Sequence, residues 1–244
     1  MDIADFWNDG MLNNADLEQL KSTDLRCVDK SGVEEFLYAG SPGEAYHVVR
    51  DIFDSVGREA MRSALFRFYV VTDVYLTAKM VMSCIGLDND EFVEAVGSAD
   101  SFIRQFEDEK SVFAYLTNLL ENCINLRNDK ACAGKSIAGQ AKAYIAAHFH
   151  EPEISLSVVA ESVNVCATYF SFIFKKETGD TFVSYLTHVR VEKAKALLGS
   201  STQRVAQIAS EVGYNDYHYF ACIFKKIVGM TPSQFRKKSR ATLP

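Results

Sequence analysis

One segment of this chain occurs twice, and this repeat constrains the fold more than any other feature of the sequence. Residues 169–179 read YFSFIFKKETG, and residues 219–229 read YFACIFKKIVG. In both copies a threonine follows the glycine by two residues, and an aromatic residue follows four residues after that. Apolar residues three or four apart are typical of an amphipathic helix, and glycine commonly ends one. The sequence therefore predicts two copies of one helical unit.

The residues before each copy predict a second, shorter helix that packs against it. In the first copy Ser155 caps this helix, Ala160 faces inward, and Asn164 makes a left-handed turn, which asparagine tolerates better than most residues. In the second copy Ala209 and Gly213 take the corresponding places. A small residue four positions before such a turn lets two helices cross closely. This is the pattern of a helix-turn-helix.

The longer helix of each copy is expected at about residues 167–177 and 216–227, the second capped by Asn215 or Asp216. Between the copies, apolar residues outline one stripe from Phe182 to Leu198. This stripe predicts a rigid connecting helix that fixes the distance between the two copies.

Composition indicates a globular chain of two domains. The chain has 244 residues, of which 48% are hydrophobic, and its most apolar stretch, residues 70–85, contains Asp73 and Lys79. That stretch does not predict a membrane span, and the acidic N-terminus does not resemble a signal peptide. The six cysteines form no CxxC pair, so we expect free and mostly buried thiols in a reducing cytoplasm.

Charge is distributed unevenly between the two halves. Residues 136–244 contain thirteen Lys and Arg against eight Asp and Glu, a net charge of +5, and the remainder of the chain carries −11. An acidic half is not suited to bind the negatively charged nucleic-acid backbone, whereas a basic half can bind it. We expect two domains, at 1–133 and 134–244, of which only the second has a charge suited to nucleic acid.

The second half resembles the C-terminal domain of AraC/XylS-type transcription regulators over residues 136–240. The resemblance implies an all-α fold in which seven helices form a double helix-turn-helix, with both recognition helices in successive major grooves of double-stranded DNA, ~34 Å apart. In the second copy it rests on Gly213, Tyr219, Phe220, Phe224, Lys225, Lys226, Gly229, Thr231, Pro232, Ser233 and Arg236. In the first copy it rests on Ala160, Phe174, Lys175, Lys176, Gly179, Arg190, Ala194, Leu197 and Leu198.

By this resemblance, certain positions on each recognition helix read base edges. They are Thr168, Ser171 and Phe172 in the first helix, and Tyr217, His218, Ala221 and Cys222 in the second. Phe172 and Cys222 stand where many family members have Arg or another long polar residue. Without Arg the commonest guanine contact is lost, so we expect contact with thymine methyl groups and recognition of DNA shape. The alternative is that both residues pack inward.

Two lysine pairs occupy the same place in each copy and are expected to contact phosphates. They are Lys175 and Lys176 in the first copy, and Lys225 and Lys226 in the second. One lysine of each pair could instead cap the helix C-terminus. Weaker phosphate candidates are Arg190, Arg204, Arg236 and Lys237. Tyr169 and Tyr219 are expected to be structural, with their rings against the core and their hydroxyl groups pointing outward.

The first half also predicts helices. We expect a helix opened by Ser41, Pro42 and Glu44 and ended by Gly57, followed by helices near 59–84, 90–96, 99–107 and 112–127.

This half resembles, diffusely, the helical region of YesN-like response regulators. The similar residues are Leu25, Phe36, Leu37, Gly40, Phe66, Arg67, Tyr69, Asp73 and Leu87. The resemblance implies dimerisation, giving a homodimer, and signal transmission, although a passive spacer is the alternative. The sequence shows no alternation of strands and helices with an acidic phosphorylation pocket, so we expect either part of a longer regulator with an upstream receiver domain or a regulator that senses by another route.

Catalysis has little support in the sequence. The five histidines are scattered, and no metal-ligand set, phosphate-binding glycine loop or nucleophile elbow is present. We therefore expect no enzyme activity, no metal and no cofactor. The competing hypothesis to a DNA-binding regulator is a protein-interaction or ligand-sensing helical module whose DNA reading has degenerated.

Overall fold

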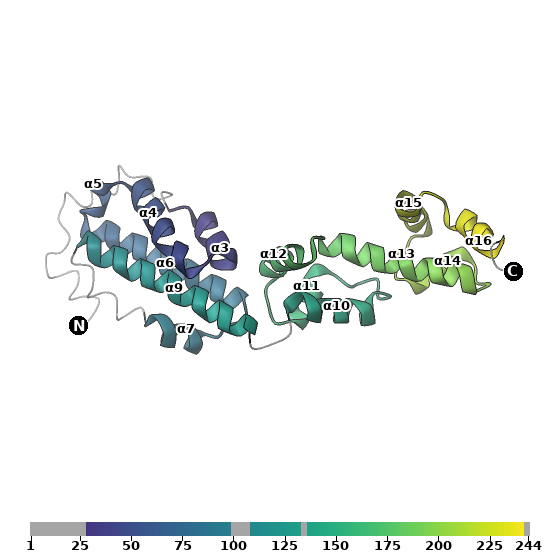
Figure 1. Ribbon diagram of the computed structural model, residues 1–244, viewed down its shortest axis with the longest axis horizontal. Coiled ribbons are helices and arrows are strands. Elements are labelled where there is room, and N and C mark those ends of the chain that lie inside the picture. The colour runs from purple at the N-terminus through teal and green to yellow at the C-terminus, as the bar shows by residue number, and fades with distance from the viewer. Residues whose placement is uncertain (1–27, 99–107, 133–135, 242–244) are drawn as a thin grey trace. The chain divides into compact units, whose positions relative to one another are not determined.

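The computed structural model describes residues 28–98, 108–132 and 136–241 (Figure 1). The chain divides into two compact units, Met1–Gly134 and Lys135–Pro244. The described residues of both units form helices and no strand, which confirms the predicted all-α class.

The described part of the first unit is built around two long helices, α6 (Ala64–Cys84) and α9 (Glu109–Cys132). These two helices pack against each other; α3 lies mainly on α6, and α4 and α7 lie on α9. The shorter elements are α3 (Lys30–Ala39), the 3-10 turn η1 (Pro42–Glu44), α4 (Ala45–Val56), α5 (Arg58–Met61) and α7 (Asn89–Val96).

The prediction of one helix over residues 59–84 is wrong, because the chain breaks between α5 and α6. The Ser63 hydroxyl caps α6 by accepting from the Phe66 amide at 3.4 Å. The Arg67 side chain reaches back and donates to the carbonyl oxygens of Met61 and Arg62, at 3.0 and 2.7 Å. These contacts satisfy polar groups at the break, which makes the interruption stable.

The other helices predicted in this half are found close to their expected positions, except the one at 99–107, which lies outside the described residues. Ser41 caps the 3-10 turn η1 in a capping box with Glu44, α4 follows directly, and Gly57 ends α4 as predicted. Of the cysteine side chains described, Cys123 is buried, and burial raises the pKa of its thiol to about 12. Cys84 and Cys166 are half-buried and Cys222 is exposed, so the prediction of mostly buried thiols is wrong for the described cysteines.

The described part of the second unit contains seven helices, as the resemblance implied. The central one is α13 (Phe182–Ser200), and the others gather about its two ends (Figure 1). Those at its beginning are α10 (Ile137–His148), α11 (Leu156–Ser162) and α12 (Ala167–Thr178). Those at its end are α14 (Val205–Glu211), α15 (Tyr217–Val228) and α16 (Pro232–Ala241).

Helix α13 contributes to two hydrophobic cores. Phe182 and Leu186 belong to the first core, with Phe170 and Phe174 of α12. Further along α13, Val191, Ala194 and Leu198 belong to the second core, with Phe220 and Phe224 of α15. The predicted connecting helix is thus shared by both repeats.

The two turns have the backbone geometry that the sequence predicts. Asn164 has φ of 56° and is the only non-glycine residue with positive φ in the described part of the chain. Gly213 takes the same place in the second copy with φ of 92°. Helices α11 and α12 meet at 88°, close to the angle of a helix-turn-helix.

Among the described residues, no single helix has both the length and the apolar composition to cross a membrane. The bent pair α11 and α12 passes that test only when the two helices are taken together.

Gly213→Ala is expected to destabilise the second unit by about 2–4 kcal/mol, because a methyl group there adds a steric clash to an unfavourable φ. A Cβ atom at Gly213 would lie 2.7 Å from both Nη2 of Arg190 and the carbonyl oxygen of Phe149. The loss of stability is measured by amide hydrogen exchange of the full chain, which should become faster in peptides from α13 to α15.

The matched control is Gly229→Ala, which has φ of 81° but no atom within 4 Å of the added Cβ. It should cost only the conformational part, about 1–2 kcal/mol. Equal losses in the two variants would show that the close approach at Gly213 has no energetic consequence.

Candidate nucleic-acid interface

Helix α12 presents a polar, basic face to solvent. Phe170 and Phe174 are fully buried, which fixes the orientation of the helix. The opposite face carries five of the residues singled out in the sequence. Of these, Thr168, Ser171, Lys175 and Lys176 are exposed and Phe172 is half-buried.

Helix α15 presents a corresponding face. Phe220 and Phe224 are fully buried, whereas Tyr217, His218, Cys222, Lys225 and Lys226 are exposed and Ala221 is half-buried. The alternative that both Phe172 and Cys222 pack inward therefore fails for Cys222, while Phe172 is partly covered.

The two helices begin with different caps. At α12 the Cys166 sulfur accepts from the Tyr169 amide at 3.4 Å. At α15 the Asp216 carboxylate accepts from the amides of His218 and Tyr219, at 2.7 and 3.3 Å. Aspartate is a strongly preferred N-cap and cysteine is not, so α15 begins with the firmer cap. Gly179 and Gly229 end the two helices in the left-handed conformation, as predicted.

The tyrosines that begin the two repeats differ in exposure. Tyr169 is 4% exposed, as expected of a structural residue, whereas Tyr219 is 58% exposed. Tyr219 is therefore much less covered than a structural role predicts, although its ring lies 6.1 Å from that of the core residue Tyr214.

The weaker phosphate candidates occupy different surroundings. Arg204 and Lys237 are exposed, and Arg236 is half-buried. The Nε and Nη2 atoms of Arg236 are covered and have no hydrogen-bond partner among the described residues.

Arg190 is the clear correction to the predicted site, because its side chain is only 8% exposed. Its Nε donates to the carbonyl oxygen of Phe149 and its Nη2 to that of Glu151, both at 2.8 Å. The guanidinium also lies over the Tyr214 ring, 5.1 Å from its centre. Burial lowers the pKa of Arg190 from its usual value, although the neighbouring Tyr214 opposes this shift. Arg190 is therefore a structural residue and is not among the phosphate contacts proposed below.

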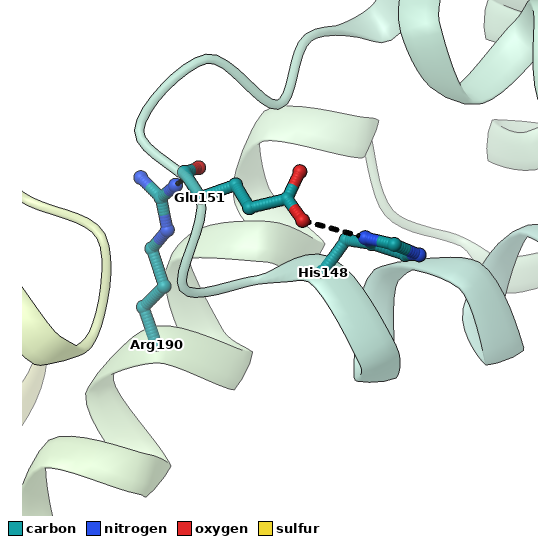
Figure 2. A network of polar contacts seen from close by, with 3 residues as sticks. All are labelled: His148, Glu151 and Arg190. Atoms are coloured by element: carbon teal, nitrogen blue, oxygen red, sulfur yellow. Dashed lines mark hydrogen bonds and ion pairs between the residues drawn. The ribbon is translucent and has the colours of Figure 1, made fainter.

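The contacts of Arg190 join the two repeats. Phe149 and Glu151 lie in the turn between α10 and α11, which belongs to the first repeat, and Tyr214 lies in the turn of the second. In the same α10–α11 turn, the Glu151 carboxylate pairs with Nδ1 of His148 at 2.7 Å (Figure 2). Phe149 itself packs against both hydrophobic cores. The contacts of Arg190 and Phe149 thus hold the two repeats, and with them the exposed faces of α12 and α15, in one structure.

Residues 159–238 match the model of a family described as a helix-turn-helix domain. The curated relatives include the MmsAB operon regulatory protein of Pseudomonas aeruginosa PAO1, 36% identical over 98 residues that make up 40% of this chain and 32% of that protein. They also include the uncharacterised transcriptional regulatory protein YesN of Bacillus subtilis 168, 36% identical over 108 residues, or 43% of this chain and 29% of the relative.

Among solved structures, the C-terminal domain of AraT, a response regulator from Geobacillus stearothermophilus, is 40% identical with a TM-score of 0.42. The match covers 43% of this chain and 86% of that one. The chain spans about a third of the length of each of these two curated relatives.

The fold and the family match together define a helix-turn-helix domain in the C-terminal half of the chain. This domain is of the AraC type found in transcription regulators, as the sequence resemblance predicted. The relatives named here are regulators of transcription, which fits the expectation that this chain is not an enzyme.

Arg190→Lys is expected to destabilise the second unit by about 1–3 kcal/mol, because lysine keeps the charge but cannot reach two carbonyl oxygens with a planar group. Hydrogen exchange of the full chain should accelerate both in the α10–α11 turn and around Tyr214. Arg204→Lys, an exposed change of the same kind, is the control and should have no effect. Faster hydrogen exchange in only one of the two turns would contradict the role of Arg190 in connecting the two repeats.

Proposed function

We propose that this chain is a sequence-specific DNA-binding transcription regulator. In this proposal α12 and α15 enter successive major grooves on one face of the duplex, about one helical turn or ~34 Å apart. The observation that carries the proposal is the pair of equivalent exposed faces held by α13. A helix of its 19 residues is ~28 Å long, which is comparable to that spacing.

The proposed base-reading residues are those exposed or half-buried on the two helices. In α12 they are Thr168, Ser171 and Phe172, and in α15 they are Tyr217, His218, Ala221 and Cys222. None of them is Arg, Lys, Asn or Gln, the side chains that read guanine or adenine through two hydrogen bonds. Contacts with thymine methyl groups and recognition of DNA shape are therefore the main source of specificity.

The proposed phosphate contacts are cationic side chains around those faces. The lysine pairs of the two repeats are exposed at equivalent places, in the last turn of α12 and of α15. Such contacts position the protein and carry no sequence information. The set comprises Lys175, Lys176, Lys225, Lys226, Arg204, Arg236 and Lys237.

The first unit is proposed to couple a signal or dimerisation to DNA binding. Its part of the chain is acidic and carries no proposed DNA contact. We place the functional domains at 1–133 and 134–244, and we propose a homodimer, a cytoplasmic location and an upstream receiver domain in the full regulator. No metal or cofactor enters the proposal.

Binding-site selection from a random duplex pool is expected to enrich a sequence with two blocks about one helical turn apart. Lys175→Ala combined with Lys225→Ala should weaken binding to that duplex by about tenfold or more, because both variants remove phosphate contacts. The slope of log affinity against log salt concentration should also decrease in magnitude by about 1.8, or 0.9 for each lost contact.

The matched control is Lys79→Ala, an exposed lysine on α6 in the first unit. It should change neither the affinity nor the salt slope. Binding to a peptide or small molecule that is insensitive to salt, without enrichment of any duplex, would favour a protein-interaction or ligand-sensing module instead.

Removal of residues 1–133 is expected to lower the affinity for a duplex that carries two copies of the selected sequence by about tenfold or more, because linked binding sites act together in a dimer. The comparison is made by titration of the same labelled duplex with the full chain and with residues 134–244. Equal affinities would contradict the coupling role and leave the first unit as a passive spacer.

A further inference from the structure

The equivalent tyrosines Tyr169 and Tyr219 differ strongly in exposure, although their local sequences are alike. Both residues stand three places after the helix cap and precede a fully buried phenylalanine. Tyr169 is almost fully covered, whereas more than half of the Tyr219 side chain is exposed to solvent. An exposed aromatic ring contributes little to the core, so the structural role expected for Tyr219 is largely removed.

Tyr219 is nevertheless held in place. Its amide donates to the Asp216 carboxylate at 3.3 Å. Its ring lies 6.1 Å from the ring of Tyr214, which is itself buried beneath the Arg190 guanidinium. Within the described parts of the chain, no hydrogen bond is formed by the Tyr219 hydroxyl. The ring of the exposed residue Tyr219 is therefore supported by its neighbours, while its hydroxyl makes no hydrogen bond to the described residues.

The helical period places Tyr219 at the edge of the exposed face of α15. His218 and Cys222 are four residues apart and run along the middle of that face. Tyr219 is three residues before Cys222 and seven before Lys226, so the three share one side of the helix. The hydroxyl is thus on the same edge as a lysine that is proposed to contact the DNA backbone.

We propose that Tyr219 is a further DNA contact, whose hydroxyl donates a hydrogen bond to a backbone phosphate beside the half-site read by α15. The inference rests on the proposed function, since it requires α15 to lie in a major groove. Tyrosine hydroxyls are among the side-chain groups that contact DNA phosphates. The contact makes the two repeats unequal, because Tyr169 cannot offer the same group from its buried position.

The test is Tyr219→Phe in the full chain, which removes only the hydroxyl. Affinity is measured by titration of the selected duplex and of a duplex of random sequence, each over a range of salt concentrations. Binding to both duplexes should weaken by the same factor, about fivefold to tenfold. The salt slope should not change, because a neutral hydroxyl displaces no counterion.

Three variants make the result specific. Tyr219→Ala should bind no more tightly than Tyr219→Phe. Lys226→Ala should lower the salt slope by about 0.9, which separates a charged contact from a neutral one. Tyr46→Phe removes a hydroxyl from a tyrosine of the first unit that is 53% exposed, and it should bind DNA like the unchanged chain.

Unchanged affinity in Tyr219→Phe would overturn this inference. The proposed function would still stand if the combined lysine variant bound weakly in the same assay. A loss confined to the selected duplex would overturn the phosphate contact, because it would show that Tyr219 reads a base. Absence of binding by the unchanged chain to any duplex would overturn both proposals.

Discussion

The buried guanidinium of Arg190 is the interaction on which the geometry of the second unit depends. A charged group that is almost fully covered is stable only when its hydrogen bonds are made, and here two carbonyl oxygens accept them at 2.8 Å. Those carbonyls belong to the first repeat, and the aromatic ring beneath the guanidinium belongs to the second. The Arg190 side chain therefore donates hydrogen bonds to a turn of the first repeat and packs on the ring of Tyr214 in the turn of the second.

The close approach at Gly213 follows from this arrangement. There is no room for a side chain between the Arg190 guanidinium and the carbonyl of Phe149, and the backbone conformation is one that glycine readily adopts. A joint fixed in this way restricts the hinge motion of one repeat against the other. For the proposed function, this means that the spacing of the two recognition helices is already fixed in the free protein. Fewer protein groups then have to become ordered when DNA binds.

Local features of the second unit could be predicted because they depend on neighbours in the sequence. The caps at Ser155 and Asp216 and the turns at Asn164 and Gly213 each follow from side-chain chemistry within a few residues. The outward faces of α12 and α15 followed from their buried phenylalanines.

Arg190 and Tyr219 could not be assigned because exposure depends on what other elements bring to the same place. From the sequence alone, an arginine on a helix is expected to be exposed. Arg190 is buried because a turn distant in the sequence supplies the carbonyl oxygens that accept its hydrogen bonds. The two tyrosines have similar local sequences, yet Tyr169 is 4% exposed and Tyr219 is 58% exposed. The break before α6 was missed for a related reason, since it is stabilised by the Arg67 side chain returning to the end of α5.

The sharing of α13 by two cores has a consequence for how such a chain can change over evolution. The repeat resembles a duplication of one small module, but its copies are no longer separable. Excision of either copy would uncover the residues that α13 presents to it, Phe182 and Leu186 at one end or Val191, Ala194 and Leu198 at the other. Excision of the second copy would also remove the contacts of Phe149 with the second core. Selection must therefore retain or lose the two copies together, even if only one of them is needed to recognise a given target.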